Sequence, residues 1–329
     1  MSDIRLGLAI RDRVLADLPD EMVVLGPADP EALSAFAGMR LSCVQRSYRL
    51  TQAYQAQGHT VIETLPDHQS CVFVSVPRSK SDARDLIAQA IGCAPAGRVI
   101  VDGQKTDGID SLSKALVKAG ANIQSFSKAH GKTIWFDAAS VAHVANEWRA
   151  PAPAIDGDWV TAAGVFSADG VDPASALLVE SLPKLSGTGA DIGAGWGYLA
   201  REVLRRNPGL DAITLVEDDA IALDCARQNV TDPRATFVWA DALGWTAGKR
   251  LDWVVMNPPF HVGRSADASL GQSFIRAAAR VLRPGGRLFM VANAHLPYAG
   301  TLDEIFGAVE TLAKTTRFRV TCAEARRTR

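Results

Sequence analysis

One apolar run that stops at two prolines is the stretch of this chain best suited to chemistry. Leu251–Met256 is long enough to form a buried strand, and Asn257, Pro258 and Pro259 follow it directly. The prolines cannot donate to a sheet ladder and hold the backbone extended. The Asn257 side-chain oxygen and the Pro258 carbonyl can then both accept hydrogen bonds from one exocyclic NH₂. The pattern therefore predicts a pocket that orients the nitrogen of a planar amine.

Aromatic and polar side chains next to this stretch can hold the planar group itself. Phe260 can stack on it, as aromatic pockets do with unstacked bases, although a core aromatic is the alternative. His261 could line the same pocket or only cap the turn. We assign Asn257, Pro258 and Phe260 to catalysis, and we assign Pro259, His261 and the upstream Phe166 to substrate binding.

A glycine-rich turn lies upstream, in Asp191-Ile192-Gly193-Ala194-Gly195-Trp196-Gly197, between a predicted strand and a predicted helix. Glycines at alternate positions let the backbone pass close beneath a ligand. The spacing differs from the G-x-G-x-x-G fingerprint of dinucleotide-binding folds. The Asp191 carboxylate can accept from a cationic amine, which suits the methionine end of S-adenosylmethionine. Asp191, Gly193, Gly195 and Gly197 are therefore predicted cofactor ligands.

Acidic residues follow the next two predicted strands. Glu217 and Asp218 end one strand, where an acid can hold two ribose hydroxyls, as it also would in a nicotinamide enzyme. Asp241 and Ala242 follow the next strand, where the acid can accept from an adenine amino group. A helix cap or a solvated loop residue is the alternative role for Asp241. These four residues and Asn257 complete the predicted cofactor site.

Strands alternate with helices along the whole chain, which predicts an α/β fold with mostly parallel sheets. We expect two tandem Rossmann-like methyltransferase domains, at residues 1–150 and 151–329, joined by a Pro- and Ala-rich segment at 149–158. The first is expected to be a degenerate copy, and the second a seven-stranded doubly wound sheet. The predicted strands are 23–25, 71–76, 99–101, 212–216, 235–239, 251–256, 287–292 and 317–321, and the predicted helices 82–91, 109–119, 172–182, 198–206, 220–229, 269–282 and 302–312.

Composition sets limits on partners and on location. A net charge of -1 argues against a broadly basic coat, although a local basic groove stays possible. The scattered cysteines form no CxxC pair and the histidines no HxxxH pair, so we expect no metal site. The N-terminus lacks the layout of a signal peptide, and no apolar run is as long as a membrane span. We expect a cytoplasmic protein, a monomer, with no membrane partner.

The four motifs, in this order, resemble those of class I S-adenosylmethionine-dependent methyltransferases. Four further stretches resemble the ribosomal RNA guanine methyltransferases of the RsmC/RlmG type: 164–172 (GVFS-x-DG-x-D), 257–263, 291–298 and 316–320. This resemblance covers most of residues 160–321. It implies methyl transfer to the 2-amino group of a guanine in ribosomal RNA, 16S rRNA for the RsmC branch. The partner would be ribosomal RNA or the 30S subunit, and the first domain would help to bind RNA.

Two features depart from that family, and other functions stay open. Trp196 stands where a small or aliphatic residue is usual, and residues 321–329 form a longer basic tail, which we expect to be a solvated end. The alternatives are a methyltransferase acting on glutamine side chains or adenine, and a catalytically idle RNA-binding module. The hypothesis of a nicotinamide oxidoreductase is less favoured, because it assigns no role to the Asn-Pro-Pro-Phe motif.

Overall fold

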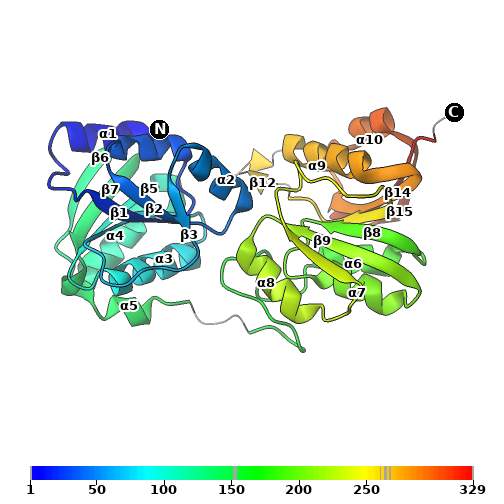
Figure 1. Ribbon diagram of the computed structural model, residues 1–329, viewed down its shortest axis with the longest axis horizontal. Coiled ribbons are helices and arrows are strands. Elements are labelled where there is room, and N and C mark those ends of the chain that lie inside the picture. Colours follow the sequence, from blue (N-terminus) through cyan, green and yellow to red (C-terminus); the bar gives the residue numbers. More distant parts are fainter. Residues whose placement is uncertain (1, 151–153, 260, 263–264, 267, 328–329) are drawn as a thin grey trace. The chain divides into compact units, whose positions relative to one another are not determined.

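The computed structural model describes residues 2–150, 154–259, 261–262, 265–266 and 268–327. The chain forms two compact units, Met1–Ala152 and Pro153–Arg329. Each unit holds its own seven-stranded sheet with helices on both faces (Figure 1). Part of the predicted linker, residues 151–153, lies outside the described residues.

The first unit has the strand order β3-β2-β1-β4-β5-β7-β6. The strands from β3 to β5 are parallel, whereas β7 runs antiparallel to both of its neighbours. Its strands are β1 (Glu21–Leu25), β2 (Arg40–Val44), β3 (Thr60–Ile62), β4 (Cys71–Ser75), β5 (Arg98–Gln104), β6 (Gln124–Lys128) and β7 (Gly131–Asp137), and its helices α1 (Ser2–Arg11), η1 (Pro30–Phe36), α2 (Tyr48–Ala56), α3 (Lys80–Cys93), η2 (Lys105–Asp107), α4 (Ile109–Lys118), η3 (Ala138–Val141) and α5 (Val144–Glu147).

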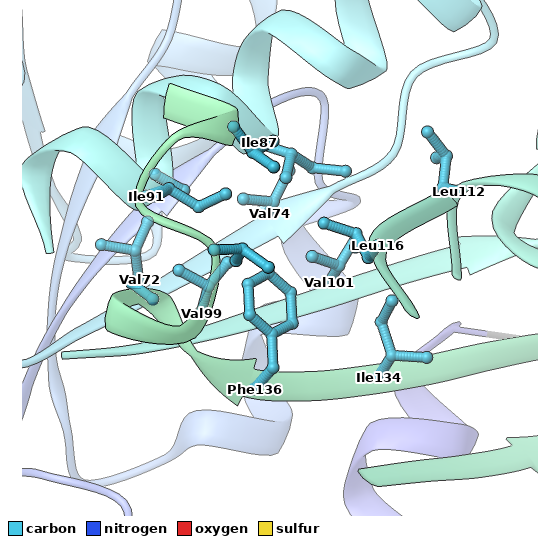
Figure 2. Packing of buried hydrophobic residues seen from close by; sticks show 14 of the residues in the cluster. Val72, Val74, Ile87, Ile91, Val99, Val101, Leu112, Leu116, Ile134 and Phe136 are labelled. Atoms are coloured by element: carbon cyan, nitrogen blue, oxygen red, sulfur yellow. The ribbon is translucent and has the colours of Figure 1, made fainter. Parts of the chain in front are cut away.

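Successive residues of the buried strands point to opposite faces of this sheet, and each face has its own helical layer. Val72 and Val74 of β4 pack with Ile87 of α3 and Leu116 of α4 (Figure 2). The intervening Phe73 belongs to a second cluster with residues of α1, η1 and α2. Burial on both faces explains why these strands read as continuous apolar runs in the sequence.

The second unit repeats this topology, with the order β10-β9-β8-β11-β14-β16-β15 and the same antiparallel pairing of its last two strands. The prediction of a seven-stranded doubly wound sheet is confirmed. Its strands are β8 (Gly187–Ile192), β9 (Leu210–Glu217), β10 (Ala235–Trp239), β11 (Leu251–Met256), β14 (Leu282–Asn293), β15 (Phe306–Lys314) and β16 (Phe318–Ala325), its helices α6 (Pro173–Ser181), α7 (Tyr198–Arg206), α8 (Ala220–Asn229), α9 (Ala268–Val281) and α10 (Ala299–Ile305), and β12 (His261–Val262) pairs separately with β13 (Ser265–Ala266).

The two faces of this second sheet also differ in their helices. Residues of α6, α7 and α8 form one buried cluster with Trp253 and Val255 of β11. The alternate residues Val254 and Met256 pack against α9 and α10 on the other side. The central strand is thus fixed from both faces, and the residues that follow it start from a rigid base.

Two predictions at the C-terminal end were wrong. Residues 302–312 were expected to form one helix, but α10 ends at Ile305 and β15 begins at Phe306. Residues 321–329 were expected to form a solvated tail, but β16 extends to Ala325 and pairs with both β14 and β15. The antiparallel pairing of β15 with β16 satisfies the backbone of this segment, and this non-local gain overrides its helical pattern. No helix among the described residues is long and apolar enough to cross a membrane.

Candidate active site at the carboxyl edge of the second sheet

The predicted site residues follow four neighbouring parallel strands of the second sheet. The strands β8, β9, β10 and β11 end at Ile192, Glu217, Trp239 and Met256. Because parallel strands bring their carboxyl ends to one edge, the segments that follow them meet there. Asp191 pairs in register with Val255, two residues before Asn257. The structure therefore brings the predicted cofactor loop and the amide side chain to the same edge.

The turn after β8 has a backbone that only glycine adopts readily. Gly193, Gly195 and Gly197 have φ angles of 75°, 56° and 90°. A Cβ on Gly195 would point into open space, whereas one on Gly197 would lie 2.9 Å from Val230 Cγ2. The turn thus leaves room for a ligand at Gly195, and at Gly197 it packs closely on the protein.

Asp191 lies beneath this turn and is fully buried. Its Oδ2 accepts a hydrogen bond from the backbone N–H of Ala200 at 3.1 Å. Ala200 is in the first turn of α7, whose N-cap is Gly197, a residue without a capping side chain. The sequence did not reveal this capping role. The other oxygen, Oδ1, is buried and has no partner among the described residues.

The burial of Asp191 changes its pKa. Burial, and to a lesser degree the charge of Glu217, raise the pKa of Asp191 to about 8, although the Ala200 hydrogen bond acts in the opposite direction. A buried acceptor with no donor is costly unless a ligand supplies one. Asp191 is therefore suited to bind a cationic or hydrogen-bond-donating ligand.

Glu217 braces the same turn from the end of β9. Its Oε2 accepts from the N–H of Gly195 at 2.8 Å, and its Oε1 accepts from the N–H of Asp219 at 2.9 Å. Burial raises the pKa of Glu217. Each carboxylate oxygen can accept a second hydrogen bond, so vicinal hydroxyls could still bind here. Asp218 contributes its backbone carbonyl, which accepts from Trp239 Nε1 at 2.7 Å.

Asp241 stabilises a turn, whereas the alternative considered for it was a helix cap or a solvated loop residue. Its Oδ1 accepts from the N–H of Leu243 at 2.9 Å, and its backbone carbonyl accepts from Gly244 and Trp245. Within the described parts of the chain, only Oδ1 of this carboxylate makes such a contact. Ala242 is buried and packs in the cluster beneath α9. Asp241 can therefore hold the turn and still offer one oxygen to a ligand.

The Asn257 side chain is held in a single orientation. Its Nδ2 donates to Asp172 Oδ2 at 2.9 Å and to Ser175 Oγ at 3.0 Å. Because the Asp172 carboxylate can only accept, a flipped amide would place its oxygen against that carboxylate and lose this hydrogen bond. Its Oδ1 is buried and has no partner among the described residues. The sequence predicted this oxygen as the acceptor for an NH₂ group, and the structure leaves it available.

The two residues that fix Asn257 were missed as site residues. Asp172 was predicted as the first residue of the helix 172–182, and its Oδ2 accepts from the N–H of Ser175 at 2.8 Å as the cap of α6. The same oxygen also receives the Asn257 amide. Asp172 ends the GVFS-x-DG-x-D stretch, so the signal was present in the sequence. What the sequence lacked was the tertiary contact between α6 and the end of β11.

A small cleft joins these elements. It is lined by Phe166, Ser167, Asp172, Ser175, Gly193, Ala194, Gly195, Trp196, Tyr198, Leu199 and Asn257. Asp191, Glu217 and Asp241 are not part of its wall. Phe166 is 58% exposed, a high value for a large aromatic side chain. An exposed aromatic ring next to an orphan acceptor is suited to a planar, hydrogen-bonding ligand.

Trp196 supports the wall from behind. Its ring is buried, packs edge-on against Trp159 with centroids 5.1 Å apart, and donates from Nε1 to the Phe166 carbonyl at 3.0 Å. This unusual residue of the glycine turn therefore positions the backbone that carries Phe166.

The residues after Asn257 are placed only in part. Pro258 is buried and Pro259 exposed. Phe260 lies outside the described residues, and His261 begins β12, with its side chain outside the description. Among the described residues, no group of His, Cys, Asp and Glu could hold a metal ion.

Comparison with known proteins identifies the family to which the chain belongs. The model of the methyltransferase small domain matches residues 156–322. The ribosomal RNA small subunit methyltransferase C of Shewanella amazonensis is 33% identical over 260 residues, which cover 76% of this chain and 75% of that protein. Its Escherichia coli O81 counterpart is 33% identical over 79% of this chain and 78% of its own length.

A solved structure has the same fold over nearly the whole chain. The T. thermophilus 16S rRNA N2 G1207 methyltransferase (RsmC), in complex with AdoMet and guanosine, aligns with a TM-score of 0.80 at 24% identity. The alignment covers 99% of this chain and 92% of that one. The resemblance inferred from the sequence motifs is confirmed. The chain belongs to the methyltransferase small domain family and, within it, to the ribosomal RNA small subunit methyltransferase C family.

Proposed function

We propose that this protein transfers a methyl group from S-adenosylmethionine to the 2-amino group of a guanine in 16S ribosomal RNA. The observation that carries the proposal is the Asn257 amide, which is fixed by Asp172 and Ser175 and has a buried oxygen with no partner in the described part of the structure. This oxygen can accept one N–H of an exocyclic amine, and the Pro258 carbonyl can accept the other. The relatives named above, at 33% identity, support the ribosomal substrate.

The residues at the glycine turn fit the cofactor. S-adenosylmethionine supplies an electrophilic methyl on a sulfonium. The unpartnered Asp191 Oδ1 would accept from its ammonium, and the backbone at Gly193–Gly195 would lie against its methionine portion. Glu217 would hold the ribose hydroxyls, and the free oxygen of Asp241 would accept from the adenine amine. The observations that support this fit are the orphan oxygen of Asp191 and the open space above Gly195.

The contribution of the protein to the chemistry is positioning. Two acceptors that hold both N–H bonds of the amine direct its nitrogen lone pair toward the electrophile. No general base is needed before transfer, because the proton can leave the methylated nitrogen afterwards. Phe166 would stack on the base, and Phe260, Pro259 and His261 are proposed to complete the substrate wall.

The first unit is proposed to be a degenerate copy that helps to bind the RNA. At the place of the glycine turn it has Gly26-Pro27-Ala28-Asp29, and at the place of Glu217 it has Gln45, whose Nε2 donates to the Gly26 carbonyl at 3.3 Å. At this edge the Gly26 carbonyl is thus engaged by a contact within the protein. We further propose that the protein acts in the cytoplasm as a monomer on the rRNA or the 30S subunit.

Replacing the target guanosine with inosine tests the proposed acceptor. Inosine lacks only the 2-amino group, so an RNA with inosine at the modified position should accept no methyl. The same RNA with 7-deazaguanosine keeps that amine and should be methylated. Incorporation of labelled methyl into both RNAs is the measurement. Equal labelling of the inosine RNA would rule out the 2-amino group as acceptor.

Phe166→Ala should raise the KM for RNA by about tenfold, because stacking of a base on an aromatic ring contributes roughly 1–3 kcal/mol. The turnover number should change much less, because the acceptors of the amine are untouched. Val309→Ala removes another exposed hydrophobic side chain of the same unit, on β15, and serves as a control. An unchanged KM in Phe166→Ala would show that Phe166 does not contact the base.

A further inference from the structure

A groove lined by arginines lies at the opposite edge of the second sheet. Its volume is about 760 Å³. Five arginines from four segments of the chain line it, together with a single acidic residue, Glu304: Arg250 before β11, Arg276 and Arg280 on α9, Arg283 in β14, and Arg326 after β16. All five arginines are exposed. Such a cluster stands out in a chain whose net charge is -1.

Much of this positive charge is not neutralised. Arg276 pairs with Glu304 at 3.5 Å, and Arg283 pairs with Asp252 at 2.6 Å. The other three, Arg250, Arg280 and Arg326, have no carboxylate partner among the described residues. They donate to backbone carbonyls instead: Arg250 to those of Arg280 and Leu282, Arg280 to that of Leu243, and Arg326 to those of Asp303, Glu304 and Phe306.

These carbonyl contacts hold the guanidinium groups in place without consuming their charge. Arg250 also covers carbonyls at the C-terminal end of α9, where the helix dipole is negative. Each guanidinium has five N–H donors, and these contacts use only some of them. The remaining donors suit phosphate oxygens, which arginine binds in a two-pronged geometry.

The position of the groove indicates how long its ligand must be. Arg250 precedes β11 and Asn257 follows it, so the six residues of that strand separate the groove from the active site. At ~3.3 Å per residue this distance is about 20 Å. A single nucleotide bound at Asn257 cannot reach the groove, whereas a nucleic acid backbone can span the distance, at ~3.4 Å per step.

We propose that this arginine groove binds backbone phosphates of the substrate RNA, away from the nucleotide that is methylated. The inference rests on the proposed function, because it takes RNA as the substrate. The groove gives affinity without reading sequence, since phosphates carry no base identity. It would hold an RNA segment that lies several nucleotides from the target guanine, on the same strand or on the opposite strand of a helix.

Charge reversal in the groove tests this inference. In the full-length protein, Arg280→Glu/Arg326→Glu should weaken binding of a fluorescent 16S rRNA fragment by about tenfold or more at ~0.1 M salt. The slope of log affinity against log salt should fall by about one to two, because fewer counterions are released. Arg280→Gln/Arg326→Gln keeps an amide donor for the carbonyls and should show a smaller loss in the same direction.

A matched control separates charge from position. Arg227 is an exposed arginine over Phe237 of β10, the strand at the far end of the strand order from β16 and β15. Arg227→Glu changes the net charge by the same amount as each single Arg→Glu replacement in the groove. It should leave RNA affinity and salt slope close to wild type. S-adenosylmethionine affinity and thermal midpoint, measured for every variant, should stay at wild-type values in the glutamine pair.

The outcomes distinguish the groove from the proposed function. The inference is supported if the wild-type protein methylates rRNA and the groove variants show a raised KM for RNA with an unchanged turnover number. The inference is overturned, and the proposed function is left intact, if the wild-type protein methylates rRNA but both groove variants bind RNA as tightly as Arg227→Glu does. If the wild-type protein methylates no RNA, the proposed function itself fails.

Discussion

Asn257→Ala should lower kcat/KM for methyl transfer by about 10²–10³-fold, the loss seen when one preorganised hydrogen-bonding group is removed from an active site. The reason is that the variant lacks the acceptor that aligns the amine, so the lone pair of its nitrogen is no longer directed. Cofactor affinity should change by less than about threefold, because the turn after β8 and Glu217 are intact. Calorimetry for the cofactor and labelled-methyl transfer for the reaction are the two measurements.

Variants of the supporting residues show whether orientation is the cause. Ser175→Ala removes one of the two acceptors of the Asn257 amide and should lower kcat by about tenfold, with KM for RNA nearly unchanged. Ser175→Thr keeps the hydroxyl and should restore most of the rate. Full activity in Asn257→Ala would contradict the positioning account. A parallel loss of cofactor binding would instead mean that Asn257 contacts the cofactor, as the sequence predicted, or acts through the fold of the edge.

Asp191→Asn should weaken S-adenosylmethionine binding by about 10- to 100-fold, since a hydrogen bond to a charged group contributes roughly 1.5–3 kcal/mol. Asparagine keeps an oxygen for the Ala200 N–H, so α7 should remain capped. Asp191→Ala removes both roles and should also lower the free energy of unfolding. If Asp191→Asn binds the cofactor normally, the carboxylate serves only as the cap of α7.

The pH dependence of cofactor affinity follows from the same residue. Its pKa of about 8 means that Asp191 is mostly protonated in the free protein at pH 7. A cationic amine requires the carboxylate, so binding should release a proton, and affinity should rise with pH, up to about tenfold per unit, and level off above about pH 8. Calorimetry in buffers of different ionisation enthalpy measures the proton. Burial also raises the pKa of Glu217, which braces the same turn, so Asp191→Asn is the necessary comparison.

The elements that carry the site were predictable from the sequence because their signals are local. Leu251–Met256 reads as a buried strand, and the prolines after it mark where it ends. The glycines at 193, 195 and 197 have left-handed backbone angles that few other residues adopt. Strand ends in a parallel sheet meet at one edge, so the approximate site followed from the order of the strands.

Contacts between distant segments could not be predicted in the same way. Asp172 reads as a helix cap, and only the packing of α6 beside β11 shows that it also holds Asn257. Arg5 lies in the first helix, yet it is fully buried and pairs with Asp102 at 2.6 Å, 97 residues away. Residues 306–314 form a strand because β16 is available to pair with them. Each of these depends on tertiary partners that no local pattern encodes.

The arginine groove could not be predicted from the sequence either. Its arginines are distributed over 77 positions of the sequence, from Arg250 to Arg326, among acidic residues that hide them in the net charge. They converge because the starts of β11 and β14 and the ends of α9 and β16 share one edge. Where charges sit, and not their sum, determines a binding surface.

Incubation of the wild-type protein with labelled S-adenosylmethionine and, separately, 30S subunits, 50S subunits and naked 16S rRNA tests the central claim most directly. Mapping of the labelled nucleoside should show one N2-methylguanosine in 16S rRNA, from the 30S subunits, the naked 16S rRNA or both, and no label in the 50S subunits. The Asn257→Ala protein should leave that nucleoside unlabelled. Label in ribosomal protein, or in adenine, would contradict the assignment of Asn257 and Pro258 to a guanine amine.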